Sequence, residues 1–184
     1  MKVFGIDPGS ERTGYGCIET DGQRHRLVTC GAISTGARIT FPERLQRIHE
    51  GLSSLLREYR PDLVAIENLF YATNARSALK LGHARGVAML AAVEGGLTVV
   101  EYTPAEVKRA VVGYGRAEKH QVADMVRVLL HLDAVPSPFD ASDALAVAIC
   151  HVHATGGAVA RPADGQRLPR SWRQWRPPAG SRPS

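Results

Sequence analysis

The chain has 184 residues, of which 44% are apolar and 22% are charged, a balance typical of one folded domain with a sizeable core. It contains no apolar run long enough to cross a bilayer, and an acid at position 7 argues against a secretory signal. We therefore expect a cytoplasmic protein without a membrane partner. Three scattered cysteines without CxxC spacing argue against a disulfide framework or a zinc site.

The net charge of +5 is concentrated at one end of the chain. Residues 155–184 hold six arginines and one acid, Asp164, whereas the rest of the chain has 17 basic and 17 acidic side chains. We expect a folded domain over residues 1–154 and a basic, disordered tail over residues 155–184 that is rich in Pro, Gly and Arg. Trp172 and Trp175 alternate with arginine there, which suits either sequence-independent DNA binding or an inert solubilising end.

The first part of the chain has the pattern of three strands. Lys2–Asp7 is an apolar run that Pro8 and Gly9 end. Gly14–Glu19 and Leu27–Ser34 follow, separated by a polar turn. Consecutive strands with short connections predict an antiparallel meander.

The apolar period then changes from that of a strand to that of a helix. Thr40 and Glu43 form a capping box, and apolar side chains recur at helical spacing from Leu45 to Leu55. The short apolar run Leu63–Glu67 then predicts a buried strand that ends in an acid.

The second half of the chain is mainly helical. Asn74 can cap a helix that runs to about Glu94, and Ala78, Gly82 and Gly86 form a stripe of small residues along it. Such a stripe lets another backbone approach closely, either that of the sheet or that of a second molecule. The remaining elements are a strand over 97–102 and helices over 104–112, 122–130 and 140–153.

This order of elements predicts an α/β fold. We expect a five-stranded mixed sheet, antiparallel in its first half and parallel in its second, with helices on both faces. Ligands of such sheets gather beyond the carboxyl ends of the parallel strands, where the strand order reverses. If the strands that end in Asp7 and Glu67 are neighbours, the two carboxylates lie side by side at that edge.

Two further acids begin the last helix. Asp140 and Asp143 are spaced i, i+3 and therefore share a face, and the apolar residues after them indicate a buried helix. Taken alone, Asp7 can simply initiate a turn, and Asp140 can be an ordinary first-turn acid. Glu67 and Asp143 need a partner, because each adjoins a buried run.

Four acids from three segments would repel one another if they converged. Mg²⁺ and Mn²⁺ prefer carboxylate oxygen and would remove that repulsion. Two such ions ~3.5–4 Å apart can hold a phosphodiester for in-line attack. The sequence therefore predicts a catalytic metal site for phosphodiester cleavage, made by Asp7, Glu67, Asp140 and Asp143.

Basic and aromatic side chains near these acids have two interpretations each. Lys108, Arg116 and Lys119 either contact phosphates or are solvated surface charges. Phe70 and Tyr71 follow Glu67 in an apparent loop, where they either stack on bases or fold back on the core. Spacing alone favours the plainer interpretation for all of them.

Several blocks in order resemble the RuvC family, the Holliday junction resolvases of bacteria. The resemblance covers Met1 to about His153. The blocks are Gly5–Ser10 with Thr13–Gly16, Ala65–Glu67, Asn74–Gly82, Val111–Gly115, Ala117–Lys119 and Asp140–Ala146. The first block also resembles the phosphate loop of actin-like ATPases, but those need two domains of this fold.

The resemblance implies a ribonuclease H-like fold and a homodimer whose two active sites nick opposed strands of a four-way DNA junction. It implies a divalent metal at the same four acids, DNA contacts by Lys108 and Lys119, and base stacking by Phe70. The family's dimer forms around the helix that begins after Asn74, and its partner is the RuvA–RuvB branch-migration complex. Residues 71–73 and the tail depart from the family pattern.

Two other functions compete with junction resolution. One is a ribonuclease H-like nuclease of the YqgF type, which acts on structured RNA. The other is a non-catalytic junction-binding protein, which would gain nothing from four acids facing phosphates. The Asn74–Gly82 block favours the resolvase.

Overall fold

The computed structural model describes residues 1–36, 38–68 and 74–156. Phe70 and Tyr71 therefore lie outside the described residues, as does the tail from residue 157 with both tryptophans. The described part forms strands β1 to β5 and helices α1 to α5: β1 Lys2–Asp7, β2 Arg12–Thr20, β3 His25–Ser34, α1 Phe41–Tyr59, β4 Leu63–Glu67, α2 Ala75–Glu94, β5 Thr98–Tyr102, α3 Pro104–Val112, α4 Lys119–Leu129 and α5 Phe139–Thr155.

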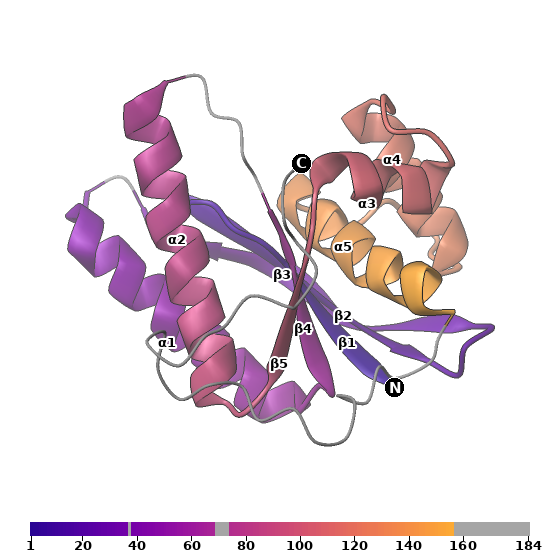
Figure 1. Cartoon of the computed structure of the whole chain (residues 1–184), viewed down its shortest axis with the longest axis horizontal. Coiled ribbons are helices and arrows are strands. Elements are labelled where there is room, and N and C mark those ends of the chain that lie inside the picture. The colour runs from indigo at the N-terminus through magenta and orange to yellow at the C-terminus, as the bar shows by residue number, and fades with distance from the viewer. Residues whose placement is uncertain (37, 69–73, 157–184) are drawn as a thin grey trace, which may run out of the picture.

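The strands form one mixed sheet in the order β3-β2-β1-β4-β5 (Figure 1). β2 is antiparallel to both β1 and β3, whereas β4 is parallel to both β1 and β5. The predicted meander and the parallel half are both confirmed. β1 and β4 are neighbours, so the strands that end in Asp7 and Glu67 run side by side.

Helices cover both faces of the sheet (Figure 1). Alternate residues of a strand point to opposite faces, and β1 shows this clearly. Phe4 and Ile6 pack with α1 and α2 in one apolar cluster. Val3 packs in the other cluster, which holds buried residues of α3, α4 and α5.

α5 lies unusually close to the sheet because glycines face it. A Cβ on Gly5 would lie 2.0 Å from the carbonyl oxygen of Ala144, and a Cβ on Gly14 would lie 2.0 Å from that of Asp140. No side chain larger than hydrogen fits at either position, so a substitution there would push the helix outward. α5 is also buried along nearly all of its length, as its apolar sequence predicts.

The small-residue stripe of α2 faces away from the sheet. Ala78, Gly82 and Gly86 are exposed, and the alternative that the stripe packs on the sheet is therefore wrong. The buried face of α2 is made by four other alanines, Ala84, Ala88, Ala91 and Ala92. Leu79 and Leu90 extend the stripe and are 64% and 51% exposed. Among the helices described, none is both long and apolar enough to cross a membrane.

Candidate active site

Adjacent strand ends bring Asp7 and Glu67 together. Ile6 of β1 pairs with Ile66 of β4, and each acid is the next residue of its strand. Both side chains are only partly exposed, because the strands before them are buried. They line one cavity of about 340 Å³.

Asp140 and Asp143 reach the same cavity from the first turns of α5. Gly14 is the residue of β2 that pairs with Asp7, and the carbonyl oxygen of Asp140 lies directly above it. The absent side chain at Gly14 therefore allows the start of α5 to lie beside the end of β1. All four acids that the sequence singles out converge in this way.

The two strand-end carboxylates are in electrostatic conflict. Burial raises the pKa of Asp7 well above its usual range, and the negative charges of Glu67 and Asp143 raise it further. Burial also raises the pKa of Glu67, although a hydrogen bond from Asp7 and the charges of Lys119 and Lys108 oppose this rise. The site therefore favours a shared proton or an added cation over two free negative charges.

The two helix carboxylates have cationic partners instead. Asp143 Oδ2 lies 3.2 Å from Lys119 Nζ, and Asp140 Oδ2 lies 3.3 Å from Arg12 Nη1. The Asp143 carboxylate raises the pKa of Lys119. Both cations are more than half exposed, so each pair contributes only about 0–1 kcal/mol to stability and is easily exchanged.

The donor set fits a hard divalent cation. It consists of carboxylate oxygens alone, which Mg²⁺ and Mn²⁺ prefer, and a cation would relieve the conflict that raises the pKa of Asp7. Asp140 and Asp143 are turned toward Arg12 and Lys119. Among the described residues, no metal site made by three or more His, Cys, Asp or Glu side chains is therefore already formed. Both ion pairs would have to open for all four carboxylates to act together.

The basic residues that the sequence singles out differ in whether they line the carboxylate cavity. Lys108 and Lys119 both line the carboxylate cavity, whereas Arg116 is exposed and is not among its lining residues. Arg12 lines the cavity and was missed, because only the three-dimensional register of β2 places it beside Asp140. Phe139, directly before Asp140, is 63% exposed.

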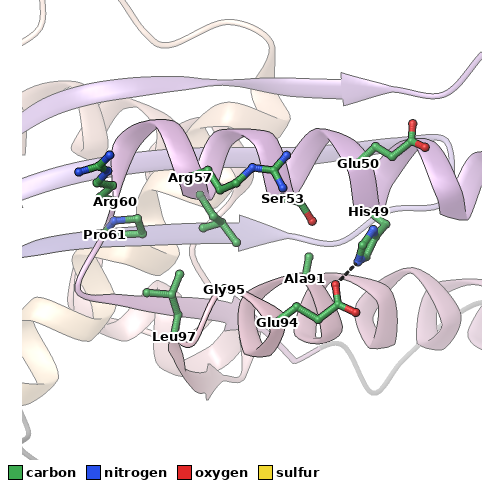
Figure 2. A pocket seen from close by; sticks show the side chains of 11 residues that line it. His49, Glu50, Ser53, Arg57, Arg60, Pro61, Ala91, Glu94, Gly95 and Leu97 are labelled. Carbon is green, nitrogen blue, oxygen red and sulfur yellow. Dashed lines mark hydrogen bonds and ion pairs between the residues drawn. The ribbon is translucent and has the colours of Figure 1, made fainter.

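A larger hollow of about 700 Å³ lies between α1 and α2 (Figure 2). Its lining includes His49, Arg57 and Glu94. It does not include Asp7, Glu67, Asp140 or Asp143. His49 Nε2 lies 2.8 Å from a carboxylate oxygen of Glu94, and Figure 2 shows this pair across the hollow.

The sheet order and the carboxylate edge define a ribonuclease H-like nuclease, and known proteins support this class. Thermus thermophilus RuvC in complex with a Holliday junction substrate has a TM-score of 0.80 and 38% identity, covering 85% of this chain and 95% of that one. The yeast mitochondrial Holliday junction resolvase Ydc2 shares the fold at a TM-score of 0.61 and 14% identity, covering 82% of this chain and 77% of that one.

Sequence comparison identifies the family. The sequence model of crossover junction endodeoxyribonuclease RuvC matches residues 3–151. The RuvC protein of Citrifermentans bemidjiense is 57% identical over 156 residues, which is 85% of this chain and 94% of that relative. That of Syntrophotalea carbinolica is 58% identical over 153 residues, covering 83% and 94%. The chain belongs to the RuvC family and is an endodeoxyribonuclease; the family is divalent-metal dependent.

Proposed function

We propose that this chain resolves four-way DNA junctions by paired nicks during recombination and repair. The observation that carries the proposal is the convergence of Asp7, Glu67, Asp140 and Asp143 in one cavity of a RuvC-family fold. The similar RuvC of Thermus thermophilus forms a complex with a Holliday junction substrate, which supports the choice of substrate. DNA as substrate also favours the cytoplasm as the site of action.

The four carboxylates are proposed as the catalytic residues and metal ligands, holding two Mg²⁺ or Mn²⁺ ions per active site. When bound, such ions supply an activated water and stabilise the leaving oxygen. Asp7 and Glu67, at the ends of two paired strands, would hold these ions at a fixed place on the sheet edge. Lys108 and Lys119 line the same cavity and are placed to bind phosphate oxygens as Lys119 leaves Asp143.

Two further DNA contacts are proposed from the sequence. Phe70 stacks on a base beside the cut, which its position three residues after Glu67 supports. Arg116 adds a phosphate contact outside the cavity, since it is exposed next to the α4 segment that carries Lys119.

A homodimer is proposed because two opposed strands must be cut. The exposed face of α2 supports it: Ala78, Gly82 and Gly86 leave room for a second helix backbone, and Leu79 and Leu90 offer apolar area. A shallow hollow of about 480 Å³ follows this stripe. The RuvA–RuvB complex is the proposed partner that moves the junction.

One assay tests the proposal and its competitors. Purified protein is incubated with a synthetic mobile four-way junction, a linear duplex of the same sequence and a structured RNA, each with Mg²⁺, with Mn²⁺ or with chelator. We expect symmetric, ligatable nicks in the junction alone and none with chelator. Faster cleavage of the RNA would instead indicate the YqgF type of activity, and binding without nicks under any divalent ion would indicate a binding protein.

A further inference from the structure

A second groove opens beside the carboxylate cavity, at the start of β2 and the end of β3. It measures about 410 Å³ and is lined by Glu11, Arg12, Ser34, Gly36 and Asp140. Arg12 and Asp140 also line the carboxylate cavity. The two hollows therefore meet at this one ion pair.

Asp140 is the counterion of Arg12, and the adjacent Glu11 is directed elsewhere. The Glu11 carboxylate lies 3.3 Å from Arg44 Nη1, and the Glu11 carbonyl oxygen accepts a hydrogen bond from the Thr35 N–H. Within the described residues, the ion pair that Arg12 makes is the one to Asp140 Oδ2 at 3.3 Å. The groove thus has one guanidinium whose neutralisation depends on an active-site acid.

Arg12 would lose this partner when the active site is loaded. Asp140 cannot fully neutralise both Arg12 and a bound divalent cation, and the two cations would repel each other. The side chain of Arg12 is 52% exposed, so its release costs little. A freed guanidinium presents a planar set of donors that matches a phosphate group.

We propose that this groove is a subsite for the phosphate next to the one being cut, with Arg12 donating to its oxygens. This inference rests on the proposed function, because it assumes a DNA strand across the four carboxylates. The rest of the groove suits a strand. Ser34 is exposed and carries a hydroxyl donor, and a Cβ added at Gly36 would meet nothing within 4 Å, so this side is open.

Neutralising single phosphates tests the subsite. Junctions carry one methylphosphonate, which removes the charge, at successive positions on either side of the cut, and nicking is measured under single-turnover conditions. For wild-type protein we expect one neighbouring position to lower the rate about tenfold, as for loss of one hydrogen bond to a charged group. For Arg12→Gln that position should have no further effect, since its partner is already missing.

Arg26→Gln is the matched control, because Arg26 forms a comparable exposed ion pair with Glu19 at the other end of the same hairpin. It should show the wild-type pattern at every position. If wild-type protein cuts the unmodified junction but Arg12→Gln keeps the full methylphosphonate effect at all positions, the subsite is wrong and the proposed function stands. If wild-type protein does not cut the unmodified junction at all, both fall.

Metal binding without DNA gives a second readout. Removing Arg12 frees Asp140 from a competing cation, so Mn²⁺ titrated calorimetrically into Arg12→Gln should bind about fivefold more tightly, although the variant cuts DNA more slowly. Arg26→Gln should bind Mn²⁺ as wild-type protein does. Weaker or unchanged Mn²⁺ binding by Arg12→Gln would contradict the role of Arg12 as the counterion that Asp140 releases.

Discussion

Two hollows at opposite ends of the same sheet differ in how their charges are balanced. The larger one, of about 700 Å³, lies near the amino ends of β4 and β5, and its Glu94 is paired with His49 (Figure 2). The smaller one, of about 340 Å³, lies at the carboxyl ends of β1 and β4 and holds four acids. In the smaller one the acids outnumber the basic side chains of the lining, and burial together with the negative charges of Glu67 and Asp143 raises the pKa of Asp7.

The comparison indicates that unbalanced charge is a better guide to the proposed active site than volume is. Selection for folding stability alone would not keep four carboxylates together, because taking a charged group out of water is unfavourable. Retaining this arrangement makes sense where a cation and a phosphate complete the site. In the larger hollow Glu94 already has His49 as a partner, and the lining also includes Arg57 and Arg60.

The largest expected effect comes from removing one acid of the smaller hollow. Glu67→Gln keeps the shape of the side chain but loses a charge, so junction cleavage should fall by about a thousandfold, equivalent to several kcal/mol of transition-state stabilisation. Junction binding, measured by gel shift, should be retained. Glu94→Gln makes the same change in the larger hollow and should leave cleavage within about twofold. Full activity of Glu67→Gln would exclude Glu67 from the reaction.

A smaller effect is expected from the basic residues of the two hollows. Lys119→Gln should slow cleavage about tenfold and reduce the salt dependence of binding by about one phosphate contact. Arg57→Gln, in the larger hollow, should change neither quantity. Binding measured over a range of salt concentrations gives the slope. Equal slopes for Lys119→Gln and wild-type protein would mean that Lys119 serves only as the partner of Asp143.

The smallest effect is a gain in stability where charge is removed. The pKa of Asp7 is higher in the folded state than in the unfolded state. Protonation of Asp7 therefore stabilises the folded state. This stabilisation is fully present below the unfolded pKa of ~3.9 and is lost as the pH rises through the folded pKa. At neutral pH the charge of Asp7 therefore destabilises the fold. Asp7→Asn should raise the melting temperature by about 2–5 °C at about pH 8 in chelator.

This gain should shrink as the pH approaches about 4, where wild-type Asp7 is protonated as well. Asp124→Asn is the control, because Asp124 is an exposed acid on α4 and its replacement should leave the melting temperature unchanged. A lower melting temperature of Asp7→Asn at both pH values would show that the carboxylate stabilises the fold, and the contrast between the two hollows would be lost.

Local patterns in the sequence were sufficient to predict the elements that carry the four acids. Hydrophobic periodicity and turn residues alone predict the strands that end at Asp7 and Glu67 and the apolar helix after Asp143. The structure confirms all three elements. The ion pairs of Arg12 and Lys119 could not be predicted in this way, since they join residues far apart in the chain.

The sequence could not predict which way the small-residue stripe of α2 faces, and the reason is different. Small residues occupy both sides of this helix: Ala78 and Gly82 on the exposed side, Ala84 and Ala88 on the buried one. Helical periodicity cannot distinguish two faces of similar size and polarity. Only the packing of α2 against α1 and the sheet decides which face is covered.

The glycine contact beneath α5 also bears on the order in which the protein is made. α5 is translated after all five strands, yet it carries half of the carboxylates and rests on the strand translated first. A polypeptide still on the ribosome with α5 inside the exit tunnel has Asp7 and Glu67 but lacks Asp140 and Asp143 at their side. Under the proposed function, a nascent chain would gain its full set of catalytic carboxylates only after α5 has left the exit tunnel.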